Sequence, residues 1–104
     1  MEPVWLMVMF DLPTRTKNQM RQANRYRNLL KDLGFERLQL SVYAKYYLSA
    51  NATKLDINEL ELSVPNHGAV RILKVTDMQW SKTIVHLGSK VLDAEEADDI
   101  LDVF

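Results

Sequence analysis

A carboxylate, Asp11, follows the most apolar run in the chain. Residues 4–10 are all apolar, Asp11 comes next, and Pro13 stands two positions later. A short run of β-forming residues without polar alternation predicts a strand that is covered on both faces. The strand must end near Asp11, because proline cannot donate a hydrogen bond to a sheet. An acid in this position is costly to place unless it has a partner or a function.

Two interpretations of Asp11 are open. In the first, the side chain caps the loop or helix that begins at Thr14. In the second, Asp11 is a catalytic metal ligand. A magnesium site usually needs one or two carboxylates together with waters and substrate phosphates, so a single Asp11 is not enough. A dimer whose axis passes near the ends of the first strands would bring two copies of Asp11 together, and the pair would share a Mg²⁺ that polarises a phosphodiester.

Basic side chains gather around one predicted helix. Apolar residues recur with a helical period from about Lys17 to Leu33, and Gly34 follows as a C-terminal cap. Seven basic residues lie on the opposite face of this helix or near it, with Asp32 as the one compensating acid: Arg15, Lys17, Arg21, Arg25, Arg27, Lys31 and Arg37. Such a face can follow a phosphate backbone, although most charged helix faces are simply solvated. Without a base-reading motif, the contacts would be to phosphates and to duplex shape.

Charge is divided unevenly along the chain. Residues 1–54 carry nine Lys and Arg against four acids, residues 55–104 carry four against ten, and the net charge is −1. Six of those acids lie in residues 93–104, which contain no basic residue. The pattern predicts a basic domain, residues 1–92, followed by an acidic C-terminal tail, residues 93–104.

The length and composition of the chain favour one small cytoplasmic domain that associates with a second copy of itself. A chain of 104 residues corresponds to a single domain, and a chain of this size buries only part of its surface, so pairing with another copy is expected. The sequence has no cysteine, which excludes a disulfide framework and a thiolate metal site. No apolar run approaches the length of a membrane span, and we expect a soluble protein.

The remaining pattern completes an α+β fold. Residues 36–48 predict two strands separated by a turn near 39–41, and residues 52–64 predict a second helix with Leu55, Leu60 and Leu62 available for the core. Residues 69–75 predict a strand, 76–80 a connector and 83–87 a short strand. Five tyrosines and tryptophans lie outside the first predicted helix. They are expected in the core or in an interface rather than stacked on bases: Trp5, Tyr43, Tyr46, Tyr47 and Trp80.

This order of elements predicts a ferredoxin-like β-α-β-β-α-β sandwich with an additional C-terminal strand. Both helices are expected on one face of the sheet, and right-handed crossovers place the first strand in its middle. The additional strand needs an edge to pair with, and a two-fold related copy is one natural supplier, which predicts a homodimer.

Several segments, taken in order, resemble the CRISPR-associated protein 2 family, and its type II branch most of all. The likeness runs from Val4 to Gly88. It rests on the segments Phe10-Asp11-Leu12-Pro13, the basic helix that closes at Gly34-Phe35, Gln39-Leu40-Ser41-Val42-Tyr43, Val75-Thr76-Asp77-Met78-Gln79-Trp80, and Leu87-Gly88.

The resemblance implies a homodimer that takes part in spacer acquisition. This homodimer would bridge two dimers of the integrase subunit, CRISPR-associated protein 1, and hold a double-stranded DNA protospacer. The resemblance also implies a Mg²⁺-dependent endonuclease that acts on RNA or DNA, with Asp11 as the metal-site aspartate. The basic residues of the first helix match the family's backbone-binding surface in general placement. C-terminal segments of the family often dock on the integrase, here by adding a strand to its edge; the apolar residues suited to this are Ile100, Leu101, Val103 and Phe104.

Three functions are therefore weighed. We favour a structural adaptor that positions DNA and integrase, in which Asp11 is catalytically idle. The main alternative is a Mg²⁺-dependent endoribonuclease or endodeoxyribonuclease that uses Asp11. One carboxylate per subunit, without an evident general base, is few catalytic groups for an enzyme. The third is a ferredoxin-like regulatory domain that binds a small ligand, and the one-sided basic helix and the lack of a Gly-rich loop count against it.

Overall fold

The computed structural model describes residues 2–92. The acidic tail, residues 93–104, lies outside the described residues, and so do its predicted partner-binding residues Ile100, Leu101, Val103 and Phe104. The elements run in the order β1 (Val4–Asp11), α1 (Lys17–Asp32), β2 (Glu36–Gln39), β3 (Val42–Tyr47), the 3₁₀ turn η1 (Asn51–Thr53), α2 (Lys54–Leu62), β4 (Ala69–Thr76), α3 (Asp77–Ser81), β5 (Val85–Leu87) and β6 (Lys90–Leu92).

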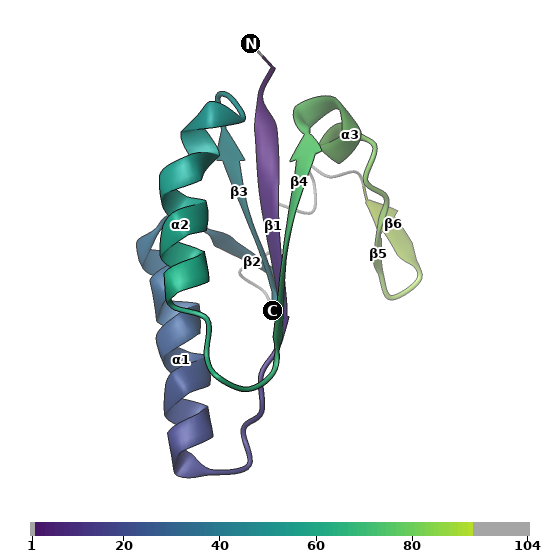
Figure 1. Cartoon of the computed structure of the whole chain (residues 1–104). Coiled ribbons are helices and arrows are strands. Elements are labelled where there is room, and N and C mark those ends of the chain that lie inside the picture. Colours follow the sequence, from purple (N-terminus) through teal and green to yellow (C-terminus); the bar gives the residue numbers. More distant parts are fainter. Residues whose placement is uncertain (1, 93–104) are drawn as a thin grey trace.

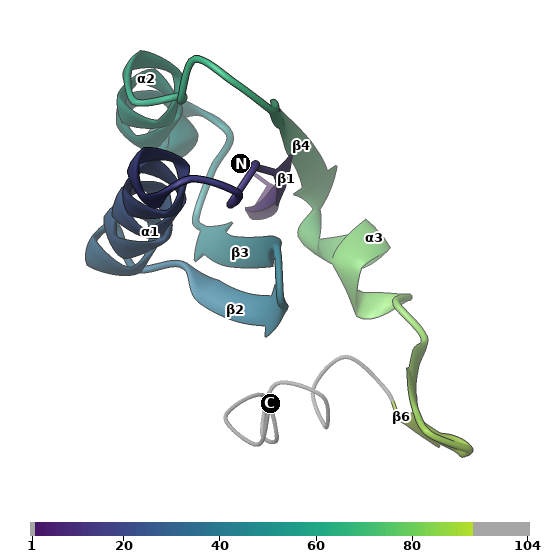
Figure 2. The same ribbon diagram turned by 90° about the horizontal axis from the view of Figure 1, so that it is seen from below.

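The sheet has the strand order β2-β3-β1-β4, and all neighbouring strands are antiparallel. Helices α1 and α2 lie side by side on one face of this sheet (Figures 1 and 2). The predicted ferredoxin-like α+β architecture is confirmed, with β1 in the interior of the sheet and a break between β2 and β3 at the predicted turn.

Local signals fix both ends of α1. Thr16 caps its N-terminus, because the Thr16 hydroxyl accepts from the backbone N–H of Gln19 at 3.1 Å and the Gln19 side chain accepts from the backbone N–H of Thr16. This reciprocal pair is a capping box. At the other end Gly34 adopts a φ of 93°, a conformation that favours glycine. The helix predicted over 17–33 is confirmed, and it turns Tyr26 and Leu30 into the core.

The core lies between the sheet and the two long helices. The even-numbered residues of β1, from Val4 to Phe10, are buried there against Tyr26 and Leu30 of α1 and Leu60 of α2. The odd-numbered residues Trp5, Met7 and Met9 point to the other face and are only half-buried. The prediction that β1 is covered on both faces therefore holds on the helix side alone, because α3 is too short to cover the opposite face.

Helix α2 corrects one part of the predicted core. Leu60 is fully buried as expected, but Leu55 and Leu62 are 82% and 75% exposed. The inward face of α2 consists instead of Asp56, Ile57 and Leu60. Residues three and four positions apart share a helix face, as Ile57 and Asp56 do with Leu60, and Leu55 and Leu62 fall outside that stripe.

The C-terminal part of the described chain contains more structure than predicted. The segment expected to be a connector forms α3, which is capped by a second capping box between Thr76 and Gln79. The predicted additional strand is present as β5, and β6 pairs with it in a small separate sheet (Figure 1). The edge that β5 was expected to take from a second copy is therefore supplied by its own chain. No helix within residues 2–92 is long and apolar enough to span a membrane.

Candidate nucleic-acid interface

Asp11 is the last residue of β1, and its side chain is exposed. The capping interpretation is wrong, because Thr16 caps α1 and the Asp11 carboxylate makes no hydrogen bond or ion pair within residues 2–92. Successive side chains of a strand alternate between faces, so Asp11 belongs to the same face of the sheet as Trp5, Met7 and Met9. That face is the one that α1 and α2 leave uncovered (Figure 2).

The backbone of Asp11 is held by a close approach of the α2–β4 loop. Asp11 pairs with Ala69 at the start of β4, and Gly68 before it has a φ of 94°. A Cβ atom at Gly68 would lie 2.5 Å from the Asp11 carbonyl oxygen, so a side chain has no room there. The end of β1 is therefore fixed by two strands and a tight loop, while its carboxylate remains free to bind.

One chain brings a single carboxylate to this position. Within residues 2–92 no three His, Asp or Glu side chains gather into a cluster suited to a metal ion. The donor set of one chain therefore fits Mg²⁺ only in part, since such sites usually take one or two carboxylates plus waters and phosphate oxygens. A second Asp11, from another copy, would complete the pair that the sequence predicts.

Helix α1 presents most of the predicted basic residues to solvent. Arg15 lies just before the helix, and Lys17, Arg21, Arg25 and Lys31 follow along it. All five are exposed, and their side chains form no ion pair within the described part of the chain. They occupy the face opposite Ala23, Tyr26 and Leu30, which pack on the sheet. The structure therefore brings these five cations together along one outer surface.

Arg27 and Arg37 have different surroundings. The Arg27 guanidinium lies over the Phe10 ring, 5.6 Å from its centroid, and donates to the Asn24 side chain at 3.3 Å. Such stacking holds the side chain against the flank of the domain. Arg37 is exposed on the edge strand β2 rather than on α1. We keep both as predicted phosphate ligands, but they lie away from the line of the other five.

An open groove of about 880 Å³ runs between α1 and the C-terminal end of α2. Arg21 and Arg25 line its α1 side, and Leu62 to Asn66 line the other. At its base the Tyr26 hydroxyl donates to the carbonyl oxygen of Leu60 at 3.2 Å. Burial raises the pKa of Tyr26 to about 12, so this phenol stays protonated and keeps the two helices joined.

The sheet face opposite the helices is largely open and mainly apolar, with Arg71 of β4 as an exposed basic residue opposite Met9. Trp80 of α3 stacks on Trp5 with ring centroids 4.3 Å apart, and the Trp5 indole donates to Asp77 at 2.9 Å. Beyond this contact Tyr46 is 42% exposed and Leu73 is 46% exposed. Of the other aromatic residues expected in the core, Tyr43 and Tyr47 are buried on the helix side.

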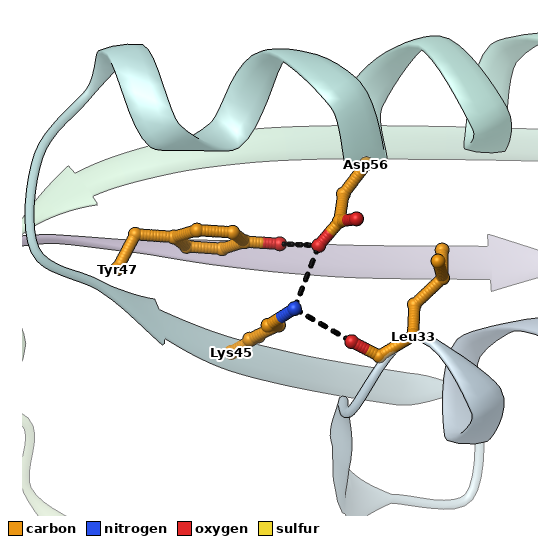
Figure 3. Close-up of polar contacts among 4 residues, drawn as sticks. All are labelled: Leu33, Lys45, Tyr47 and Asp56. Atoms are coloured by element: carbon orange, nitrogen blue, oxygen red, sulfur yellow. Dashed lines mark hydrogen bonds and ion pairs between the residues drawn. The ribbon is translucent and has the colours of Figure 1, made fainter.

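Sequence reasoning missed a polar cluster beneath the helices (Figure 3). Lys45 of β3 donates to the Leu33 carbonyl oxygen at 2.6 Å and to Asp56 Oδ2 at 2.8 Å, and the Tyr47 hydroxyl donates to the same oxygen at 2.5 Å. The cluster ties the end of α1 and the start of α2 to the sheet. No local pattern predicts it, because its members are nine to twelve positions apart.

The charges of this cluster support one another. Burial by itself would raise the pKa of Asp56, but the hydrogen bonds from Lys45 and Tyr47 and the positive charge of Lys45 outweigh it and hold the pKa of Asp56 below its usual value. Burial, followed by the hydrogen bond to Asp56 and its negative charge, raises the pKa of Tyr47. At neutral pH the cluster therefore contains a carboxylate, an ammonium group and a neutral phenol, which positions it to stabilise the fold.

Comparison with known proteins identifies the family. The family model described as CRISPR associated protein Cas2 matches residues 4–83. The chain belongs to this family. The resemblance seen in the sequence is thereby confirmed, and the Cas2 family match removes the support for a small-ligand regulatory domain.

Curated relatives in the Cas2 family cover nearly the whole chain. Proteins named CRISPR-associated endoribonuclease Cas2 from Paracidovorax avenae, Parvibaculum lavamentivorans and Flavobacterium psychrophilum are 36%, 32% and 29% identical to it. Each alignment covers 97% of this chain, and 94%, 100% and 88% of the respective relative.

Proposed function

We propose that this chain is a dimeric adaptor of CRISPR spacer acquisition, which binds protospacer duplex DNA through its phosphates and bridges integrase dimers in the cytoplasm. Membership of the Cas2 family supports the CRISPR context. The observation that carries the DNA-binding role is the row of exposed cations on and before α1: Arg15, Lys17, Arg21, Arg25 and Lys31. Cations without a partner in their own domain are available to displace counterions from phosphates.

The open face of the sheet supports a homodimer. Large apolar side chains that remain exposed together mark an interaction surface, and Leu73, Tyr46 and half-buried Met7 lie on this face. A second copy packed face to face would cover them. Asp11 ends the same face, so a two-fold axis near it would bring both carboxylates together.

Such a dimer would carry its basic helices on the two outer layers. The β1–α1 connection and the start of α1 lie at the same end of the domain as the α2–β4 loop (Figure 1). The cations near the start of α1, Arg15 and Lys17, would therefore flank the paired Asp11 end from both copies. A duplex that crosses this end would touch both chains.

Charge reversal on α1 tests the DNA-binding role. In the variant Arg21→Glu/Arg25→Glu, we expect mixed-sequence duplex affinity to fall by about 10- to 100-fold at physiological salt, with a shallower salt dependence, because two phosphate contacts are lost. Fluorescence anisotropy across a salt series measures both. The matched control Lys54→Glu/Lys82→Glu makes the same change in net charge away from α1. If the two variants bind equally well, the basic face of α1 is not the binding surface.

A Mg²⁺-dependent nuclease is the second candidate. It is favoured by the name endoribonuclease that the Cas2 relatives carry and by the exposed Asp11 carboxylate, which has no hydrogen-bond or ion-pair partner within residues 2–92. The Asp11 side chains of two copies would hold the ion, which when bound would polarise a phosphodiester as a Lewis acid. Whether the substrate is RNA or DNA is part of the test.

Asp11→Asn separates the two candidates. If the chain is a nuclease, cleavage of RNA or DNA in Mg²⁺ disappears in this variant and in the presence of a chelator, whereas duplex affinity stays the same. Cleavage that survives the substitution points to another site. If neither protein cleaves and both support spacer acquisition with the integrase, the adaptor role stands alone. Docking of Ile100, Leu101, Val103 and Phe104 on the integrase stays a prediction.

A further inference from the structure

Within residues 2–92 the open face of the four-stranded sheet carries one basic side chain, Arg71 of β4. Arg71 pairs with Met9 of β1, and its neighbours Val70 and Ile72 pack against the core on the helix side. Successive side chains of a strand alternate between faces, so Arg71 belongs to the open face. The other basic residues of these strands pair with residues that are buried under the helices: Arg37, Lys45 and Lys74.

Arg71 and Asp11 are close to each other on this face. Asp11 pairs with Ala69, and Arg71 lies two positions further along β4, which makes the acid and the base diagonal neighbours across two paired strands. Diagonal neighbours are within reach of a long side chain. Both residues are exposed, and neither makes a hydrogen bond or an ion pair with its side chain within residues 2–92. The other acid of the sheet on this face, Glu36, lies on β2, two strands away from β1.

A second copy would bring these charges together. This inference rests on the homodimer proposed above, in which a two-fold axis near Asp11 brings two carboxylates together. Like charges that face each other across an interface are unfavourable. Because each Arg71 is a diagonal neighbour of its own Asp11, the same axis also brings both guanidinium groups to the carboxylate pair. We propose that Arg71 of each copy binds the Asp11 carboxylate of the other copy, so that two acids and two bases close the dimer.

The two side chains are suited to different parts of this cluster. The Asp11 side chain is short, and its backbone is held by pairing with Ala69 and by the close approach of Gly68, so the carboxylate cannot turn far from the axis. The Arg71 side chain is long, stays charged and binds a carboxylate through two parallel hydrogen bonds. It can also turn to solvent. Loss of the base should therefore weaken the dimer, whereas loss of the acid should be tolerated.

The cluster has a consequence for the nuclease candidate. The guanidinium groups occupy the space beside the carboxylates where a divalent cation would bind, so Arg71 competes with Mg²⁺ for the Asp11 oxygens. The dimer then assembles without metal. For the wild type, we expect the dimer dissociation constant in millimolar Mg²⁺ to stay within about threefold of its value in a chelator.

A double-mutant cycle on dimerisation tests the pairing in a chelator and without nucleic acid. Arg71→Met should raise the dimer dissociation constant about tenfold at low salt, because it removes two guanidinium groups per dimer. In the Asp11→Asn background the same substitution should change the constant by less than about twofold, since no carboxylate pair remains. Sedimentation equilibrium measures each protein. The matched control Lys74→Met removes an exposed basic residue from the other face of β4 and should leave the constant unchanged.

Exchange of the two charges is a second test. Asp11→Arg gathers four guanidinium groups near the axis and should weaken the dimer by more than about tenfold. The variant Asp11→Arg/Arg71→Asp restores opposite charges and should recover most of this loss. Both positions are exposed in the single chain, so neither variant disturbs the core.

Several outcomes would overturn the pairing. These are equal effects of Arg71→Met in both backgrounds, no recovery on charge exchange, and a wild-type dimer that forms only with Mg²⁺. Coupling that appears in urea unfolding of the dilute monomer, and not in dimer dissociation, would place the ion pair within one chain. A wild type that stays monomeric would overturn the proposed homodimer as well. A wild-type dimer without coupling would overturn this inference alone, so the two failures are distinguishable.

Discussion

The two faces of β1 are equally apolar in sequence but differ in their surroundings. On one face Val4, Leu6, Val8 and Phe10 are all at most 6% exposed beneath α1 and α2. On the other, Trp5, Met7 and Met9 are half-buried and Asp11 is exposed. The helix-covered face also contains the cluster of Lys45, Tyr47 and Asp56. On this face, therefore, the apolar side chains are packed and these polar side chains are hydrogen-bonded.

This difference separates stability from function. The helix-covered face is completed by the chain itself and accounts for the folding of the domain. The open face keeps apolar side chains and one carboxylate that the described chain does not cover. Because β1 has the composition of a strand buried on both sides, the open face is the surface where a second copy is expected.

The largest expected effect is on the open face. Leu73→Asp would place an unpaired charge in the centre of the proposed dimer interface, at a cost of about 3–5 kcal/mol, which corresponds to more than about a 100-fold rise in the dimer dissociation constant. Sedimentation equilibrium measures it. The control Leu55→Asp introduces the same charge on the outer surface of α2 and should leave the mass unchanged. Equal masses for the two variants would remove the interface from this face.

On the helix-covered face the expected effect is on folding alone. Leu60→Ala should lower the free energy of unfolding by about 3 kcal/mol, because it empties a fully buried position. Leu62→Ala, two residues away and 75% exposed, should change it by less than about 0.5 kcal/mol. Urea unfolding at fixed protein concentration measures both. Similar losses from the two leucines would contradict the placement of α2.

The polar cluster should give a smaller and pH-dependent effect. Asp56→Asn removes the carboxylate that Lys45 and Tyr47 share, and should cost about 1–2 kcal/mol at pH 7. The folded pKa of Asp56 lies below its unfolded value of about 3.9. Its contribution to stability is therefore complete above that pH and is lost as the pH falls through the folded pKa.

Urea unfolding of wild type and Asp56→Asn from pH 7 to pH 3 measures this dependence. The two curves should approach each other below about pH 4. Glu61→Gln is the control, since Glu61 is exposed on α2 and has no ion-pair partner within residues 2–92, and it should change stability little at any pH in this range. A gap between wild type and Asp56→Asn that stays constant across the range would mean that charge plays no part in the cluster.

Local chemistry made most of the fold predictable from the sequence. The apolar run and Pro13 define β1, Gly34 ends α1, and the turn near residues 39–41 divides β2 from β3. The Thr76 and Gln79 capping box was also readable as the start of a helix, but α3 is so short that its few apolar residues carry no periodicity. For α2 the sequence offered three leucines, and only the contact with the sheet selects Leu60.

Long-range contacts account for what the sequence did not predict. The Trp5 indole donates a hydrogen bond to Asp77, 72 positions away in the sequence, and Lys45 donates one to Asp56, 11 positions away. Of the seven basic residues, five share the outer surface of α1 as expected. Arg27 lies on the flank of the helix, as its spacing predicts, but its contact with the Phe10 ring is one that no spacing in the sequence reveals.

The most direct test of the account is to join two chains through Asp11. In this cysteine-free chain, Asp11→Cys places one thiol at the end of the open sheet face, and Glu59→Cys places one on the outer surface of α2. If two copies meet face to face about an axis near Asp11, a short bismaleimide converts Asp11→Cys rapidly into a covalent dimer and leaves Glu59→Cys monomeric. Equal, slow crosslinking of both would show that the two carboxylates do not meet and would contradict the proposed dimer.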